Sequence, residues 1–352
     1  MLKSHQPRMS KPTPIYRGRG ETYQADACAP LVDAVRRGKT RMEALCRGHY
    51  PGRPLAQNRL PGVKSIGYWD ADGFQDWGLP RHRNEGIEIA LLESGDLAFE
   101  VEGQEFALKP NHLTVTRPWQ EHRLGNPRIG SGRLHWMILD VGIRRPNQPW
   151  KWPPWLILSQ PDLRELTNIL RHNEQPVWTS SSDLRRTFLG IAHGVESDRN
   201  GSSTSRLAIL INELFMQLLD IFRAQRVPLD LSLSSSQRTV ELFLADLSAH
   251  PEHVSVDWSV GDMAQSCGLG VTQFIHHVRV LTNMTPMQYL NHARLDLAAR
   301  LLRESPDRSI TDVSLDCGFS TAQYFATLFS HRFGCAPREF RTSGMNDARG
   351  AD

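Results

Sequence analysis

The feature that most constrains the fold of this 352-residue chain is an internal repeat near its C-terminal end. Five residues, Ser259, Asp262, Ala264, Cys267 and Gly268, return 50 positions later as Ser309, Asp312, Ser314, Cys317 and Gly318. After one added residue, a second set matches at an offset of 51: Phe274, Val278, Asn283, Pro286 and Tyr289 with Phe325, Phe329, Gly334, Pro337 and Phe340. This regularity predicts two copies of one small fold.

Each copy carries the signals of a short helix, a tight turn and a second helix. Ser259 and Ser309 can cap a helix start, and the aspartate three residues later completes a capping box. The glycines of the repeat supply the left-handed residue that ends a helix. Ala264 and Ser314 are small where two helices would cross. The repeat therefore predicts two helix-turn-helix units.

The second helix of each copy has one apolar side and one polar side. Phe274 and Val278, and likewise Phe325 and Phe329, are spaced for burial, and Cys267 and Cys317 are expected to be small buried thiols. Between the copies, residues 287–302 form one amphipathic helix that begins after Pro286. A rigid helix of this kind would fix the spacing of the two units. If the second helix of each unit enters the major groove, the units should lie one DNA turn, roughly 34 Å, apart.

This segment resembles the DNA-binding domain of AraC/XylS-type transcription regulators. The resemblance is carried by Ser314-Leu-Asp-Cys-Gly-Phe-Ser320, the Phe325 and Phe329 pair, Phe333-Gly-Cys-Ala-Pro337 and Phe340-Arg341, and it covers about a hundred residues.

The resemblance implies positions for DNA contacts. Base-reading residues would be Thr272, Ile275 and His276 in the first unit, and Ala322, Gln323, Ala326 and Thr327 in the second. Glutamine can pair bidentately with adenine, and threonine or alanine can meet a thymine methyl group, whereas isoleucine donates no hydrogen bond. Phosphate contacts are expected from Arg279, Arg294, Arg332 and His331.

Upstream of this domain, the sequence consists of short apolar segments separated by turn residues. Strands are predicted at residues 66–69, 87–92, 97–101, 105–108, 113–116 and 134–141, a spacing typical of a small antiparallel barrel or sandwich. Before them, apolar residues between Pro30 and Cys46 recur every three or four positions, which predicts one helix or two short helices.

The barrel region resembles a cupin. His82, Asn84 and Glu88, followed by Gly95, are similar to the first cupin motif, and Pro118-Trp-Gln-Glu-His122 is similar to the second. Because Asn84 stands where metal-binding cupins have a histidine, we expect no metal. The polar residues would instead bond one another or a ligand, and an effector would contact Trp77, His82, Glu88, His122 and Trp136. A facial metal triad is the alternative.

Two helical patterns follow the strands. Leu163, Leu166, Ile169 and Leu170 form one stripe, and Leu207, Ile211, Leu214, Leu218 and Ile221 form a stronger one with four- and three-residue spacing. The stronger stripe fits either packing within its own chain or a contact between the subunits of a homodimer.

The predicted fold class is α+β, an N-terminal cupin-like β-barrel with helices and a C-terminal all-α domain with two helix-turn-helix units. The expected parts are a basic arm with short helices (1–64), an effector-binding and dimerisation domain (65–230), a Ser-rich linker (231–237) and an AraC-type DNA-binding domain (238–345).

Charge is distributed unevenly along the chain. The net charge of +3 combines +9 in residues 1–64 with −3 in residues 65–236, −2 in residues 237–345 and −1 in the last seven residues. The basic arm is either a contact to nucleic acid or a solvated surface segment. A slightly acidic DNA-binding domain is unusual, although helix N-termini and local arginines can still serve phosphate.

Composition sets the cellular context. Five cysteines without a CxxC pair favour reduced thiols, and neither a signal peptide nor an apolar run of about 18 residues is present. We therefore expect a cytoplasmic protein without a membrane partner.

Together these features predict a sequence-specific transcription regulator, without enzymatic activity or cofactor. Its partners would be double-stranded DNA, a small-molecule effector, for which the family resemblance favours a sugar, and a second copy of the chain. An activator would also contact RNA polymerase. The alternatives are a cupin-type metal-dependent enzyme that carries a DNA-binding domain, and a DNA-binding protein whose barrel only dimerises.

Overall fold

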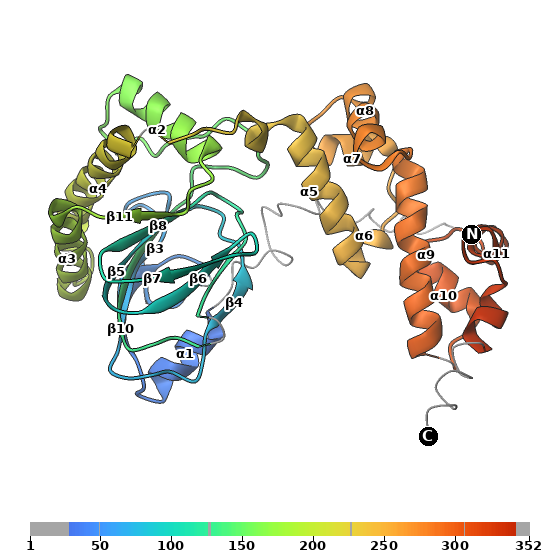
Figure 1. Cartoon of the computed structure of the whole chain (residues 1–352), viewed down its shortest axis with the longest axis horizontal. Coiled ribbons are helices and arrows are strands. Elements are labelled where there is room, and N and C mark those ends of the chain that lie inside the picture. Colours follow the sequence, from blue (N-terminus) through green and yellow to red (C-terminus); the bar gives the residue numbers. More distant parts are fainter. Residues whose placement is uncertain (1–27, 49, 126–127, 226, 306, 343–352) are drawn as a thin grey trace, which may run out of the picture. The chain divides into compact units, whose positions relative to one another are not determined.

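A computed structural model describes residues 28–48, 50–125, 128–225, 227–305 and 307–342 of the chain. The basic segment 1–27, and with it the expected contact of the arm to nucleic acid, lies outside these residues. The chain divides into two compact units between Ser234 and Ser235. Each unit is described by itself (Figure 1).

The first unit is built on two β-sheets. The larger has the order β11 (Val177–Thr179), β8 (His112–Thr116), β5 (Ile87–Gly95), β10 (Gly132–Leu139), β3 (Val63–Ala71), β1 (Arg41–Cys46) and β2 (Arg53–Pro54). The smaller has the order β4 (Leu79–His82), β9 (His122–Leu124), β6 (Leu97–Val101) and β7 (Gln104–Leu108). Neighbouring strands are antiparallel except β1 and β2, which are parallel. The predicted strands are confirmed as β3, β5, β6, β7, β8 and β10.

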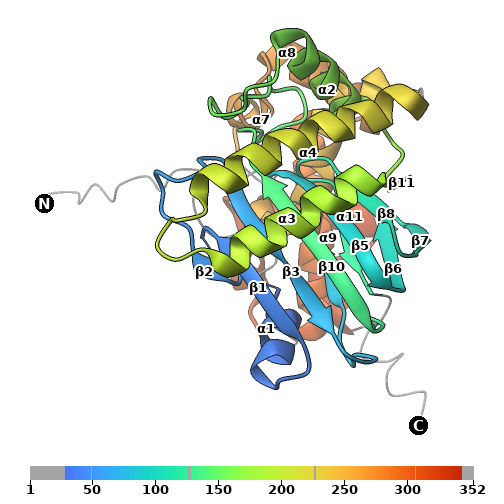
Figure 2. The same cartoon turned by 90° about the vertical axis from the view of Figure 1, so that its left-hand side faces the viewer.

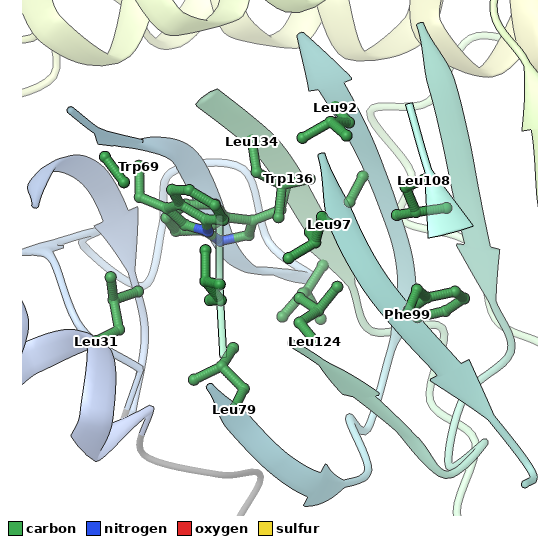
Figure 3. Packing of buried hydrophobic residues seen from close by; sticks show 14 of the residues in the cluster. Leu31, Trp69, Leu79, Leu92, Leu97, Phe99, Leu108, Leu124, Leu134 and Trp136 are labelled. Carbon is green, nitrogen blue, oxygen red and sulfur yellow. The ribbon is translucent and has the colours of Figure 1, made fainter. Parts of the chain in front are cut away.

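The space between the sheets holds the apolar core of this unit. Side chains from both sheets meet there, among them Trp69 of β3, Phe99 of β6, Leu124 of β9 and Trp136 of β10 (Figure 3). Successive side chains of a strand point to opposite faces of the sheet, so only every second residue faces this core. On β10 the buried His135 therefore points to the opposite face of the sheet from Trp136.

The prediction of helix throughout residues 30–46 is wrong in its second half. α1 (Ala29–Arg36) forms, and the chain then turns through Gly38, whose φ of +69° suits a residue without Cβ. Residues 41–46 instead form β1, paired with β3 in the larger sheet. Met42, Ala44 and Cys46 also alternate with a period of two, and they face the core between the sheets. The barrel thus begins inside the segment expected to be an arm.

Besides α1, three longer helices accompany the sheets: α2 (Gln160–His172), α3 (Ser182–Ser197) and α4 (Thr204–Gln225). α3 and α4 run side by side across the outer face of the larger sheet (Figure 2). At their contact Gly194 leaves room for Leu207, since an added Cβ would lie 2.9 Å from Leu207 Cδ2. No helix in the described parts of the chain combines the length and apolar character needed to cross a membrane.

The apolar stripe of α4 packs inside its own chain. Leu207, Ile211, Leu214 and Leu218 are each 0% exposed in the single subunit. Their partners include α3, which the sequence did not predict, and aromatic contacts such as Phe222 with Trp178 at 4.8 Å between ring centroids. This stripe is therefore not available as a contact between subunits, and the packing interpretation is correct.

The second unit consists of helices in the described range. They are α5 (Ser236–Ala249), α6 (Pro251–Val254), α7 (Val260–Ser266), α8 (Val271–Thr282), α9 (Pro286–Glu304), α10 (Ile310–Asp316) and α11 (Ala322–Phe333). The Ser-rich stretch 231–237, expected as a linker, contains the division between the two units. It holds a 3₁₀ turn, η1 (Leu231–Ser234), and the first residues of α5, which Ser235 caps.

The two helix-turn-helix units are confirmed as α7 with α8 and α10 with α11, joined by α9. Ala264 and Ser314 are buried at 1% and 0% exposure, as expected for close crossings. The capping box is complete at Ser259, while at Ser309 only the bond from the Asp312 N–H to Oγ forms. Burial raises the pKa of the Cys317 thiol to about 12, which fits an inert buried side chain.

Candidate ligand pocket and nucleic-acid interface

A pocket lies inside the first unit, where the two sheets and α1 meet. Its lining is mostly apolar, with a polar group at one end: Cys28, Leu31, Tyr50, Pro51, Ser65, Trp69, Leu79, His82, Asn84, Glu88, Leu124, Leu134, Trp136 and Ile138. The free volume between these side chains is about 40 Å³. This is enough for water molecules but not for a larger ligand until a wall moves.

The polar end brings together three residues that the cupin resemblance had named. His82 and Glu88 line the pocket, whereas His122, which was also expected to contact an effector, is not among the lining residues and reaches the pocket through Glu88. Glu88 Oε2 lies 2.8 Å from His122 Nε2 and accepts a hydrogen bond from Asn84 Nδ2 at 2.7 Å. The ligand atoms of His82, Glu88 and His122 all lie within 4.8 Å of one another. Because both described bonds reach Oε2, Glu88 Oε1 remains to meet a ligand.

Charges within this cluster are set by burial and by the short contact. Burial raises the pKa of Glu88, but the hydrogen bond and charge of His122 outweigh it, and the net shift is downward. Burial lowers the pKa of His122, but the bond and charge of Glu88 outweigh it, and the net shift is upward. Burial and the charge of His122 lower the pKa of His82 to about 4. These shifts favour the charged forms of Glu88 and His122, and the lowered pKa of His82 favours its neutral form.

Both imidazole rings are oriented by backbone carbonyls. His82 Nδ1 lies 2.8 Å from Pro80 O, and His122 Nδ1 lies 2.9 Å from Gln120 O. If Nδ1 donates to the carbonyl, Nε2 of each ring is the atom that faces the cluster. The same atoms, with Glu88, are the ones in this part of the chain that could hold a divalent metal.

The aromatic wall of the pocket differs in part from the expectation. Trp136 lines the pocket, and its Nε1 donates to Ser65 Oγ at 2.9 Å. Trp77 does not line it: this residue packs edge-on against Trp69 at 6.3 Å and donates from Nε1 to Gln75 Oε1. Trp69 is the second indole of the wall (Figure 3). The alternation of Ser65, Gly67 and Trp69 along β3 was the signal that could have identified it.

In the second unit, α8 and α11 each turn a polar face outward. Phe274 and Val278 of α8, and Phe325 and Phe329 of α11, are fully buried as predicted. Opposite them, Thr272, His276, Gln323 and Thr327 are exposed, while Ile275, Ala322 and Ala326 are half-buried. Gln273 and Tyr324 share this exposure and were missed. The predicted base-reading residues thus lie on the accessible faces of the two helices.

The arginines expected to contact phosphate have different surroundings. Arg279 is exposed on α8, and His331 is exposed at the end of α11. Arg332 is partly exposed and binds Asp296, with Nη2 at 2.7 Å and 2.8 Å from the two carboxylate oxygens. Arg294 is buried at 7% exposure.

Both the polar end of the pocket in the first unit and the helix-turn-helix units of the second lie in regions that match known protein families. A family model described as an AraC-like ligand binding domain matches residues 70–219, and a helix-turn-helix domain model matches residues 263–343. The chain is 37% identical over 272 residues to the HTH-type transcriptional activator RhaS of Escherichia coli O81 (strain ED1a), across 75% of this chain and 87% of that protein. The RhaS of Klebsiella pneumoniae (strain 342) is 34% identical over 267 residues with the same coverage.

This chain belongs to the AraC family. Among solved structures, the DNA-binding domain of AdpA in complex with a target DNA is similar at 28% identity, covering 31% of this chain and 97% of that chain, with a TM-score of 0.28. ToxT from Vibrio cholerae O395 is similar at 10% identity, covering 86% of this chain and 96% of that chain, with a TM-score of 0.30. As an AraC-family member, the chain is a DNA-binding transcription regulator with a ligand-binding domain.

Within the AraC-type DNA-binding domain, Arg294 has a structural position instead of the expected phosphate contact. From α9 its Nε donates to Val254 O at 3.1 Å and its Nη2 donates to Val256 O at 2.8 Å. The guanidinium also lies 5.9 Å from the ring centroid of Phe319. Arg294 therefore ties the end of α6 and the chain directly after it to the turn of the second helix-turn-helix unit.

We expect Arg294→Met to lower the free energy of unfolding by about 1–3 kcal/mol, because two carbonyls lose their donors. The salt dependence of DNA binding should stay unchanged, whereas loss of a phosphate contact would reduce the log–log slope by about 0.9. Chemical denaturation and a salt titration of DNA affinity measure the two quantities. If the variant is as stable as the unaltered protein and its DNA affinity depends less steeply on salt, Arg294 contacts phosphate.

Proposed function

We propose that this AraC-family regulator is a sequence-specific activator whose DNA binding responds to a small, neutral, polyhydroxylated effector such as a sugar. The observation that supports this class of effector is the contact between Glu88 and His122 at the polar end of a pocket whose walls include Trp69 and Trp136. We further propose that it acts in the cytoplasm as a homodimer, without enzymatic activity. Similarity to RhaS activators supports activation.

The charge balance of the pocket favours a neutral ligand. Glu88 and His122 neutralise each other, so an ionic effector would bring an unpaired charge into a buried site. Oε1 of Glu88 can accept from a hydroxyl group, and neutral His82, whose Nδ1–H donates to Pro80 O, can accept at Nε2. The indoles of Trp69 and Trp136 offer flat apolar surfaces to the C–H face of a sugar ring. Polar contacts at one end and apolar walls beside them suit a polyol.

Entry of a sugar requires a movement of the pocket wall. The free volume of about 40 Å³ is far below the size of typical ligand sites, roughly 300–1,000 Å³. Such a movement is also what an effector needs to act, because a ligand changes an equilibrium only through different affinities for two arrangements.

For DNA, we propose that α8 and α11 read base edges with their exposed faces. Gln323 would pair with adenine, and Thr272 and Ala322 would meet thymine methyl groups. Arg279, Arg332 and His331 would contact phosphate, Arg332 after exchanging Asp296 for the nucleic acid.

Gln323→Ala should weaken binding to specific DNA by about 1–3 kcal/mol and leave binding to random DNA nearly unchanged, because only a base-edge contact carries sequence information. The operator is obtained by selecting bound fragments from genomic DNA, and affinities are measured at fixed salt. Arg279→Ala is the matched control, since a lost phosphate contact weakens both DNAs alike. An equal loss on both DNAs for Gln323→Ala would refute base reading by this residue.

The proposed homodimer needs a surface other than the buried stripe of α4. Sedimentation of the full chain measures its oligomeric state directly.

The metal-enzyme alternative rests on the proximity of His82, Glu88 and His122. Metal analysis of the purified chain separates the two functions. If each chain holds one tightly bound ion and removal of the ion abolishes an enzymatic activity, the first unit is a metal-dependent enzyme and not an effector sensor.

A further inference from the structure

The turn between β8 and β9, residues 117–121, is tied to the polar end of the pocket. The N–H of Trp119 donates to Asn84 O at 2.7 Å, and Gln120 O meets His122 Nδ1 at 2.9 Å. Trp119 has a φ of +67°, and its indole donates to Ile143 O at 2.7 Å. A bulky residue keeps a left-handed backbone only where its surroundings fix it. The turn therefore has one defined shape that depends on the pocket residues.

Arg117 begins this turn and reaches away from the pocket. Its N–H donates to Gln120 Oε1 at 3.1 Å, and its carbonyl accepts from the Gln120 N–H at 3.1 Å. Its side chain is only 13% exposed. Nη1 binds Glu174 Oε1 at 2.7 Å and lies 3.5 Å from Asn173 O, and Nη2 lies 3.5 Å from Glu102 Oε1. A movement of the turn would thus move the guanidinium against the residues that follow α2.

His172, the last residue of α2, and Asn173, which follows it, hold the last segment of the first unit. His172 O accepts from the Asp230 N–H at 2.7 Å, and His172 Nε2 lies 2.8 Å from Ser234 Oγ. Asn173 forms a β-bridge with Leu229. Hydrogen bonds from Ser232 lower the pKa of Asp230, and the charges of Arg117 and His172 lower it further. The residues that Arg117 contacts and those that hold residues 229–234 are thus neighbours in the chain, directly before α5 begins the second unit.

We propose that Arg117 is the positioning residue that couples the state of the pocket to residues 229–234. The proposal rests on the proposed effector function and adds the route by which the pocket reaches the segment before the DNA-binding unit. A packed and hydrogen-bonded route carries coupling only if its contacts differ between two states. Arg117 can satisfy this condition, since its one planar guanidinium bonds acceptors on two separate segments, Glu102 and the adjacent pair Asn173 and Glu174, and a shift of the turn changes these bonds together.

The test is a double-mutant cycle on amide hydrogen exchange of residues 229–234, in the full chain without effector or DNA. Glu88→Gln removes the charge that faces His122 and should change exchange of this segment at least threefold. In the Arg117→Ala background, the same substitution should change it by less than 1.5-fold. Because neither effector nor DNA is present, failure of the proposed function and failure of this coupling are distinguishable.

Two further variants complete the experiment. Arg117→Lys keeps the charge but cannot span three acceptors, so it should reduce the coupling as well, and it serves if Arg117→Ala does not fold. Arg83→Ala is the control: Arg83 Nη2 lies 3.3 Å from Glu121 Oε2 of the same turn, and its loss should leave the threefold effect of Glu88→Gln intact. Equal effects of Glu88→Gln with and without Arg117, or no effect on residues 229–234 in the unaltered background, would overturn the proposal.

Discussion

Replacing Phe329 with alanine should unfold the second helix-turn-helix unit, with a loss of about 3–5 kcal/mol in the free energy of unfolding. Phe329 is fully buried, and its ring centroid lies 5.4 Å from that of Phe325, 4.5 Å from Phe333 and 5.3 Å from Phe340. These three aromatic neighbours, from α11 and the segment after it, cannot fill the space that remains when the ring of Phe329 is replaced by a methyl group. The cost therefore includes both lost burial and a residual cavity.

Thermal unfolding of the full chain, followed by calorimetry, measures this loss as a lower temperature of the transition that belongs to the second unit. Leu315→Ala is a matched control, because Leu315 lies on α10 of the same unit but is 53% exposed. Its effect should stay within about 0.5 kcal/mol. If the Phe329 variant melts like the unaltered protein, Phe329 is not a core residue.

Glu88→Gln should abolish or strongly weaken the response of DNA binding to the effector, while DNA binding without effector stays intact. Glutamine keeps the size of the side chain but removes the charge that pairs with His122 and orders Asn84. A tenfold change of DNA affinity by the effector requires about 1.4 kcal/mol of coupling. One hydrogen bond to a charged group is worth about 1.5–3 kcal/mol, enough to supply that coupling.

The experiment first identifies the effector by scanning neutral monosaccharides for a change in thermal stability of the chain. The affinity for the selected operator is then measured with and without that sugar. Glu105→Gln on β7 is the matched control, since Glu105 is exposed and lies outside the pocket lining. A normal response of the Glu88 variant would contradict the assignment of the pocket as the effector site.

Most of the second unit was predictable from the sequence because its determinants are local. N-caps such as Ser259, turn glycines such as Gly318 and the spacing of Phe325 and Phe329 act within a few residues of chain. The structure places these residues where the repeat predicted them. The alternating segments of the first unit were equally informative, since period two fixes which side chains face the core.

The pocket cluster was also predictable in part. His82, Glu88 and His122 were named from two motifs, and the structure brings their ligand atoms within 4.8 Å. Their ionisation was not predictable, because it depends on the 2.8 Å contact of Glu88 with His122 and on burial from all sides.

Sequence alone thus determined the helix-turn-helix repeat, the strand-rich first half and the polar end of the pocket. Only the tertiary structure decided that the apolar face of α4 is covered within its own chain and that residues 41–46 join a sheet. It also decided that Trp69 and not Trp77 lines the pocket, and that Arg294 is buried. The physical reason is common to all four. Local signals report the period of an apolar pattern, but burial and hydrogen-bond partners are supplied by segments distant in the chain, such as α3 and the carbonyls after α6.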